Sequence, residues 1–257
     1  NFFVPNPAVT NVNVTDSGAF SDYHALQFEL RRRLSRGLSA NVNYQYAFAE
    51  GGSAFDGFSF GRIMTPTANV RHAIKMQWDW TLPFGRGQRF GRDMHPILHG
   101  LVGGWSFNGV GRIQTVLRDF GNVKLVGMTK ADLQKMYKFY VKPNTATGID
   151  EVWMLPDDVI LNTRRAFSTI NTTVDGYSTS LGAPTGRYIA PANSASCIQV
   201  RPGDCAPRNL LILAPWFKRF DVGATKRFDI HGPMNIEVRF DVLNVLDTPN
   251  FDPVSNP

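Results

Sequence analysis

The 257-residue sequence lacks any run of the ~18 consecutive apolar residues that a transmembrane helix needs, which excludes a helical membrane protein. It has only two cysteines, too few for a disulfide-rich scaffold or a four-cysteine zinc site. Charged residues are also sparse, at 19%, but hydrophobic residues make up 43%, so the chain is not wholly disordered. These absences leave a folded protein whose class must be found from the pattern of its residues.

The motifs of common enzymes are missing as well. The sequence has no Gly-x-Ser-x-Gly, no His-Glu-x-x-His and no glycine-rich phosphate loop. We therefore expect no enzyme activity, no catalytic or metal-binding residue and no cofactor. His95 and His99 have the spacing of a helical metal pair, but Pro96 and Gly100 argue against a helix, so we expect a loop there.

The chain begins at Asn1 with no charged-then-apolar leader, so we expect a processed or partial product. Its 27 Lys and Arg against 21 Asp and Glu favour an anionic partner, and phospholipid, lipopolysaccharide and nucleic acid all qualify. The arginine run at 31–36 sits at a predicted hairpin rather than on a helix or a disordered arm. We therefore expect no nucleic-acid partner.

The strongest pattern is an alternation of apolar and polar residues with a period of two. It predicts strands with one apolar and one polar face. Several of these strands reach about 11 residues, longer than the usual ~5–6 and long enough for a tilted strand to cross a bilayer. The predicted strands cover residues 23–33, 38–49, 69–82, 102–115, 216–229 and 234–246.

The links between the predicted strands alternate between short and long. Such an order puts short turns on one rim and long loops on the other, as in outer-membrane barrels. Six strands cannot close a barrel with a channel, so the fold class we predict is all-β, part of a larger antiparallel transmembrane β-barrel. The alternative is a soluble or surface-attached β-sandwich module that recognises a glycan or a protein.

Several segments resemble the late barrel strands of TonB-dependent outer-membrane transporters of the Oar-like branch, which carry a carboxypeptidase-regulatory-like domain. One is the stretch NVRHAIKMQWDWTLPFGRGQRF at 69–90, and another is EVRFDVLNVLDTPNF at 237–251. Similar matches occur at 21–49, 103–115 and 208–228. The sequence departs from the family at 115–118, where Thr-Val-Leu-Arg stands in place of a Ser-Gly-x-Pro turn.

The resemblance implies a receptor in the outer membrane of a Gram-negative bacterium that takes up a solute, with the whole of 1–257 in a plugged barrel of about 22 strands. Its partners would be outer-membrane lipid and, through parts outside this chain, a plug domain and TonB. Siderophore, peptide and oligosaccharide all remain open as the solute. The long segment 116–212 would be an extracellular loop that offers a surface to a further partner.

On this interpretation the polar positions of the strands face the lumen of the barrel. The candidate lumen residues are Gln27, Glu29, Asn41, Asn43, Gln45, Lys75, Gln77, Asp79, Asn108, Arg112, Gln114, Glu237, Arg239 and Asp241. Basic residues at the short links would form a periplasmic rim beside anionic head groups. The rim candidates are Arg31, Arg33, Arg36, Arg86, Arg89, Arg92 and Arg227.

The long loop has structural signals of its own. Thr129 with Asp132 predicts the start of a short helix, and Pro156 predicts the start of a second helix that runs to Phe167. Cys197 and Cys205 flank a turn, and the resemblance puts them outside the cell, where disulfides persist. We expect these two cysteines to form a disulfide, with two free thiols as the alternative.

Overall fold

The computed structural model describes residues 17–52, 64–168, 174–199, 201, 203–231 and 233–250. The chain divides into two compact units. One comprises residues 1–24, 48–70 and 116–215, and is called here the loop unit. The other comprises 25–47, 71–115 and 216–257, and is called the sheet unit. Across the described ranges, no helix is both long and apolar enough to span a membrane.

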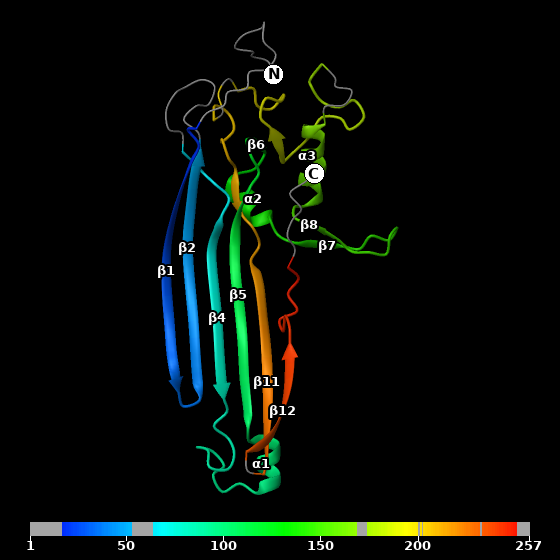
Figure 1. Cartoon of the computed structure of the whole chain (residues 1–257). Helices are drawn as coiled ribbons and strands as arrows, with labels where there is room; N and C mark the ends of the chain where they lie inside the picture. The colour runs from blue at the N-terminus through cyan, green and yellow to red at the C-terminus, as the bar shows by residue number, and fades with distance from the viewer. Residues whose placement is uncertain are drawn as a thin grey trace. The chain divides into compact units, whose positions relative to one another are not determined.

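Six long strands run side by side in one sheet (Figure 1). Their order is β1-β2-β4-β5-β11-β12, so neighbours in the sheet follow the order of the chain. The strands are β1 (Phe20–Ser35), β2 (Leu38–Gly52), β4 (Val70–Thr81), β5 (Trp105–Asp119), β11 (Phe217–His231) and β12 (Met234–Val242). All six predicted strands are present. Within the described residues the sheet is open, with β1 and β12 at its edges.

The last strand is shorter than predicted. β12 ends at Val242 rather than at residue 246, because the backbone turns at Asn244 and Asp247, which have φ angles of 51° and 45°. The Asn244 amide N–H donates to the Asp221 carboxylate at 2.8 Å, which holds this turn against β11. The alternation itself breaks at this point, because Leu243 and Val245 are apolar at odd positions and Asn244 is polar at an even one.

The first hairpin closes on a two-residue turn, Arg36 and Gly37. Both residues have positive φ, 54° and 77°, the conformation that matches the twist of paired strands. The Thr81 N–H donates to the Gly37 carbonyl at 2.8 Å and joins this turn to the end of β4. A β-carbon at Gly37 would lie 2.6 Å from the Thr81 carbonyl oxygen, so the position requires glycine.

The registers keep apolar residues together on one face of the sheet. Even positions pair with even positions between β2 and β4, as in Val42 with Met76, and between β11 and β12, as in Ala224 with Phe240. Even positions of β11 pair with odd positions of β5, as in Ala224 with Phe107. We call this side the apolar face and the opposite side the polar face. The sequence predicts this change of parity, because the lumen candidates Asn108, Arg112 and Gln114 on β5 are even-numbered whereas those on the other strands are odd-numbered.

A helix stands where we expected a loop. α1 (Pro96–Val102) follows His95, whose ring nitrogen accepts a hydrogen bond from the Ile97 N–H at 3.4 Å. The expectation was wrong because Pro96 occupies the first turn, where a missing N–H costs nothing. Gly100 is tolerated in a helix at a cost of only about 1 kcal/mol.

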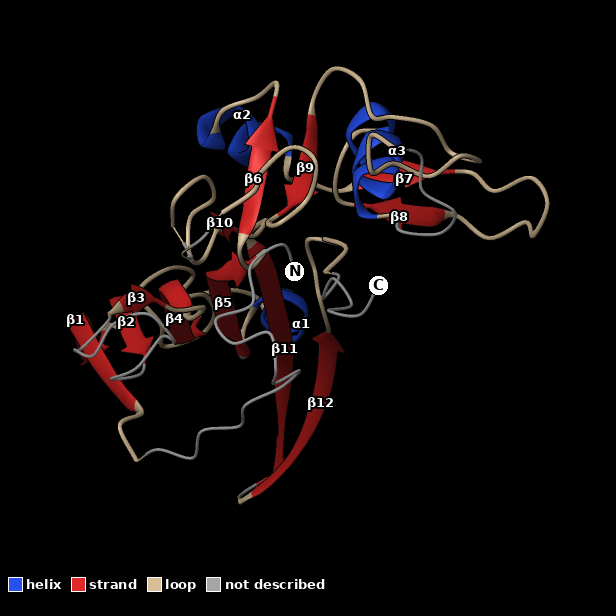
Figure 2. Ribbon diagram, turned by 90° about the horizontal axis from the view of Figure 1, so that it is seen from above, coloured by secondary structure: helices blue, strands red, loops and turns tan. Residues whose placement is uncertain are grey.

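The loop unit has small elements around its own core. β3 (Thr65–Pro66) extends the large sheet beside β2, and β10 (Leu211–Leu213) pairs with β5. β6 (Val123–Val126) pairs with β9 (Tyr188–Pro191), and β7 (Tyr140–Lys142) pairs with β8 (Glu151–Trp153). Figure 2 shows these strands with the helices α2 (Lys130–Met136) and α3 (Asp157–Phe167). Both helices begin where the sequence predicts them.

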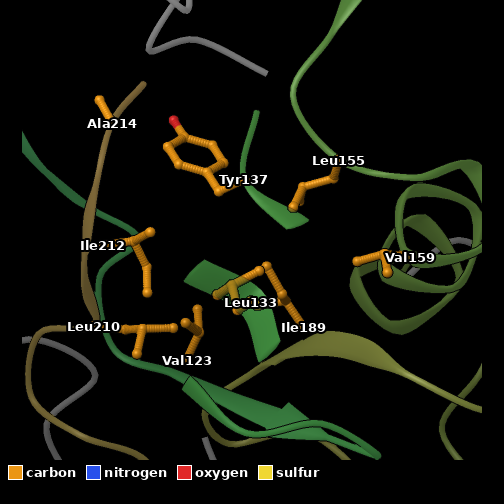
Figure 3. Packing of buried hydrophobic residues seen from close by; sticks show 9 residues of the cluster. All are labelled: Val123, Leu133, Tyr137, Leu155, Val159, Ile189, Leu210, Ile212 and Ala214. Atoms are coloured by element: carbon orange, nitrogen blue, oxygen red, sulfur yellow. The ribbon is translucent and has the colours of Figure 1, made fainter. Parts of the chain in front are cut away.

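The core of the loop unit is a cluster of buried apolar side chains (Figure 3). Leu133 of α2, Val159 of α3 and Ile212 of β10 are fully buried. The cluster comprises Val123, Leu133, Tyr137, Leu155, Val159, Ile189, Leu210, Ile212 and Ala214. Segments up to ninety residues apart in sequence therefore pack together, and residues 116–212 are a folded structure rather than a plain connection.

Candidate functional site

The polar face of β1, β2 and β4 is hollowed at two places. One hollow brings together five candidate lumen residues, along with Phe28, Tyr44 and Ala73: they are Gln27, Glu29, Asn43, Gln45 and Lys75. The second is lined by Arg31, Arg32, Arg33, Leu34, Ser39, Ala40, Asn41, Gln77 and Asp79. Each hollow mixes cationic, anionic and amide side chains, so each presents both hydrogen-bond donors and acceptors to one side of the sheet.

The register explains this grouping. Asn43 lies opposite Lys75, and Asn41 lies opposite Gln77, so their side chains project from adjacent strands toward the same side. Within β2, the Asn43 amide nitrogen donates to the Asn41 side-chain oxygen at 3.3 Å.

The polar face of β5, β11 and β12 carries arginine–carboxylate pairs two residues apart in one strand. Arg219 contacts Asp221 at 3.1 Å, Arg227 contacts Asp229 at 2.9 Å, and Arg239 contacts Asp241 at 2.9 Å. On β5, the Arg112 Nε donates to the Gln114 side-chain oxygen at 2.8 Å. Arg219, Asp221 and Asp229 were missing from the predicted set, although the same alternation puts them on this face.

Gly223 has a specific place among these groups. It pairs with Asn108 on one side and with Asp241 on the other. A β-carbon at position 223 would lie 2.6 Å from the Asn108 side-chain oxygen and 2.7 Å from an Asp241 carboxylate oxygen. The missing side chain lets two polar groups from the flanking strands approach each other across β11. A glycine in a strand signals such a close approach, but not which side chains make it.

The rim arginines gather at the end of the sheet unit that holds the short turns. Arg31, Arg33 and Arg36 lie in and beside the first turn, and Arg86, Arg89 and Arg92 lie between β4 and α1. Arg36 and Arg89 line a shared hollow with Gly37, Thr81, Pro83 and Gln88. The seventh, Arg227, lies opposite Glu237 on the polar face, and its backbone N–H donates to the Gly104 carbonyl at 2.9 Å, just after α1.

Lys226, next to Arg227, lies on the opposite side of the sheet. Its side chain is buried, and its ammonium donates to the Gly103 carbonyl. The ammonium also lies 5.5 Å from the ring centre of Trp105 and 5.1 Å from that of Phe228. A lysine on the apolar face therefore finds its partners among aromatic rings and one backbone oxygen.

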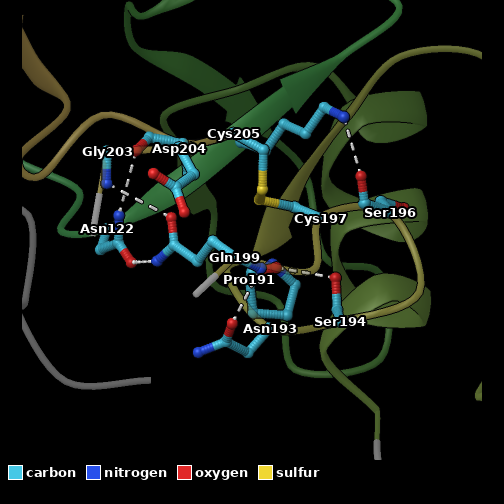
Figure 4. Close-up of a disulfide and its surroundings, with 12 residues drawn as sticks. Asn122, Pro191, Asn193, Ser194, Ser196, Cys197, Gln199, Gly203, Asp204 and Cys205 are labelled. Carbon is cyan, nitrogen blue, oxygen red and sulfur yellow. Dashed lines mark hydrogen bonds between the residues drawn. A yellow bond between two sulfur atoms is a disulfide. The ribbon is translucent and has the colours of Figure 1, made fainter. Parts of the chain in front are cut away.

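In the loop unit, Cys197 and Cys205 are joined in a disulfide (Figure 4), and their Cα atoms are 5.8 Å apart. Next to it, the Gln199 amide donates to the Asn122 side-chain oxygen, and the Asn122 amide donates to the Pro207 carbonyl at 2.7 Å. Asn122 thus bonds Gln199, inside the loop that the disulfide closes, and Pro207, just after that loop. It joins both to the strand β6, which begins at the next residue. This network was not evident from the sequence, because Asn122 is some eighty residues away.

Two carboxylates of the loop unit have a pKa below the ordinary value. Arg187 makes two hydrogen bonds to Asp158, at 2.6 and 3.1 Å, and these lower the pKa of the Asp158 carboxyl. The side-chain and backbone hydrogen bonds of Thr129 lower the pKa of Asp132 in the same way. Burial raises the pKa of the Tyr137 hydroxyl. These groups stabilise elements of the unit, and within the described ranges no group of His, Cys, Asp and Glu side chains is arranged to hold a metal ion.

A family model described as an outer membrane beta barrel domain covers residues 1–257. No curated protein matches the chain. No solved structure matches it either.

Proposed function

Because the chain belongs to the outer membrane beta barrel domain family, which indicates the outer membrane of a Gram-negative bacterium, we propose that it forms part of the wall of a TonB-dependent transporter of the Oar-like branch. The observation that carries the proposal is the separation of the two faces of the six-stranded sheet. One face is predominantly apolar, with Lys226 of β11 as a buried exception, and suits contact with lipid, while the other carries the hollows and ion pairs.

The polar face has the chemistry of a surface that contacts water, a plug and a passing solute. Six of its charges are paired within one strand, and a guanidinium or carboxylate group in such a pair can still make further hydrogen bonds. The mixed hollow around Asn43 and Lys75 can contact a polar solute without strong selection by charge. Selectivity would then reside in the plug and in the loops.

The loop unit supports a role beyond connecting two strands. A segment of this length with its own core, two helices and a disulfide presents fixed side chains to the outside. We propose that it forms part of the outer entrance and contacts the solute or a surface partner.

Thiol labelling of intact cells tests the proposal. Asn43→Cys is expected to react with a membrane-impermeant thiol reagent, while its neighbour Val42→Cys on the apolar face stays unreactive. The native cysteines are bonded to each other, so the introduced thiol is the single reactive group. Equal reactivity at both positions would contradict the assignment of the faces.

TonB dependence needs a separate comparison. A plug that TonB displaces would cover and uncover the polar face, so the labelling rate of Asn43→Cys is expected to differ between cells with and without TonB. An identical rate in the two strains, with Val42→Cys still unreactive, would leave a barrel wall but remove the TonB-dependent transporter.

A further inference from the structure

Helix α1 lies at the end of the sheet unit that holds the short turns (Figure 1). It exposes a stripe of apolar side chains. Ile97, Leu98, Leu101 and Val102 are 70%, 52%, 67% and 42% exposed, and α1 has no buried residue. Positions spaced one and four apart share one side of a helix. The four side chains therefore form a continuous apolar surface that this unit leaves uncovered.

The opposite side of α1 is attached to the protein. His99 accepts a hydrogen bond from the Arg86 N–H at 3.1 Å and lies against Gly85, where a β-carbon would meet its Nδ1 atom at 2.6 Å. The Gly103 N–H donates to the His99 carbonyl at 2.8 Å and ends the helix. Because His99 fixes the orientation of the helix, the protein itself holds the apolar stripe on the exposed side of α1.

The stripe is continuous with the apolar face of the sheet. Trp105 belongs to that face, and its indole N–H donates to the Leu101 carbonyl at 2.9 Å. Lys226, also on the apolar face, directs its ammonium to the Gly103 carbonyl just after the helix. Tryptophan is typical of the level where acyl chains meet head groups, and the buried Lys226 joins the end of α1 to the apolar face.

The segment before α1 supplies positive charge. Arg86, Arg89 and Arg92 are all exposed, against one nearby acidic residue, Asp93. Arg89 shares a hollow with Arg36 of the first turn. Exposed guanidinium groups beside an apolar helix match the phosphates and acyl chains of an anionic lipid surface.

We propose that α1 lies in the membrane–water interface of the periplasmic leaflet as an anchor for the short-turn end of the sheet. Ile97, Leu98, Leu101 and Val102 enter the acyl region, and the arginines contact the phosphates of anionic phospholipids. This inference rests on the outer-membrane placement of the sheet and is independent of what the protein transports.

Nitroxide labels on single cysteines test the depth of the helix, with the protein reconstituted in vesicles of phosphatidylethanolamine and phosphatidylglycerol. Oxygen concentrates in the acyl region, whereas a charged nickel chelate stays in water. A label at Leu98→Cys is expected to show an oxygen-to-nickel accessibility ratio several-fold above that at Gly100→Cys. Gly100 is the matched control because it lies in the same helix, away from the stripe, and a β-carbon there enters open space.

Two results would overturn the proposal. High nickel accessibility at Leu98→Cys would mean that the stripe faces water, and low accessibility to both reagents would mean that a protein surface covers it. A label at Val42→Cys separates this proposal from the orientation of the sheet. If Val42 gives the lipid signature and Leu98 does not, only the anchor is wrong, whereas failure at both positions removes the lipid assignment of the whole face.

A change of lipid tests the arginines. In vesicles of phosphatidylcholine alone, the oxygen-to-nickel ratio at Leu98→Cys is expected to fall, and Arg86→Gln with Arg89→Gln and Arg92→Gln is expected to reproduce that fall in phosphatidylglycerol. An unchanged ratio in both cases would overturn the anionic head-group part of the proposal.

Discussion

The indole of Trp78 on β4 occupies the space above Gly109 on the adjacent strand β5. A β-carbon at position 109 would overlap the ring, with Cε2 at 2.6 Å. Next to it, Gly111 receives Phe220 from β11 and Met76 from β4 in the same manner. Two glycines of one strand thus form a trough on the apolar face, which large side chains from both neighbours fill.

We expect Gly109→Ala to displace the Trp78 indole and to lower the free energy of unfolding by about 1–3 kcal/mol, as for an overpacked core. Tryptophan emission and urea unfolding of the reconstituted protein measure the two effects. In the double variant with Trp78→Phe, the smaller ring leaves room for the methyl group, so the two losses should fall short of additive. Strict additivity would mean that the two residues do not interact.

The face assignment predicts a difference between adjacent residues of β2. Val42→Arg puts a charge on the apolar face near the middle of the strand and is expected to cost about 2–4 kcal/mol, with a loss of assembled protein. Asn43→Arg puts the same charge on the polar face and should be tolerated. The amount of heat-modifiable protein in outer-membrane fractions measures assembly, and comparable amounts of both variants would disprove the assignment.

The N-terminal cap of α2 is a local interaction, and the loss of stability on its removal can be predicted. Thr129 and Asp132 exchange hydrogen bonds at the start of the helix, where the Asp132 N–H donates to the Thr129 hydroxyl at 3.2 Å. Thr129→Ala is expected to destabilise the helix by about 1 kcal/mol, while Thr129→Ser keeps the acceptor and should be nearly neutral. Hydrogen exchange of the Leu133 amide reports the difference, and equal protection in both variants would show that the cap contributes nothing.

The disulfide should stabilise the loop unit without affecting the sheet. Closure of so short a loop contributes about 2–3 kcal/mol in the chain-entropy model. Cys197→Ser and Cys205→Ser are expected to leave assembly intact but to speed proteolysis between Gly182 and Arg208. If thiol labelling of the non-reduced, unfolded protein gave two reactive thiols per chain, the bridge itself would be ruled out.

The ion pair of Asp158 and Arg187 makes the loop unit sensitive to acid. Because the pKa of Asp158 is lower in the folded protein, its contribution is complete above the ordinary value of 3.8 and disappears as the pH falls through the folded pKa. Protease sensitivity of the unit should therefore rise in a titration from about pH 5 to pH 2. Asp158→Asn should flatten this rise, and Asp150→Asn, which removes another exposed carboxylate, should not.

The strands and the two helices of the loop unit could be predicted from sequence because their signals are local. Alternation defines a strand such as β2, and Thr129 with Asp132 defines the start of α2. Helix α1 was missed because Pro96 and Gly100 are helix breakers in most positions, and only the position of Pro96 in the first turn makes it compatible.

Contacts between distant segments could not be predicted in the same way. The alternation put Asn43 and Lys75 on polar faces, but their pairing depends on a register that the lengths of the links do not determine. The role of Gly223 between Asn108 and Asp241 depends on three strands at once. The lumen and rim assignments therefore remain predictions, although the registers bring most of their residues together.

The alternation of apolar and polar positions within each strand has a consequence for how this chain can diverge over evolutionary time. A single-residue insertion in any strand would rotate every later side chain of that strand to the opposite face, exchanging lipid-compatible residues for charged ones. Length changes within the wall are therefore expected to survive selection in steps of two residues, or paired with a bulge. The segment between β5 and β11 has its own core, so it is free to gain or lose residues singly. Homologues should differ most in length there, and new binding specificities can arise without any change in the wall.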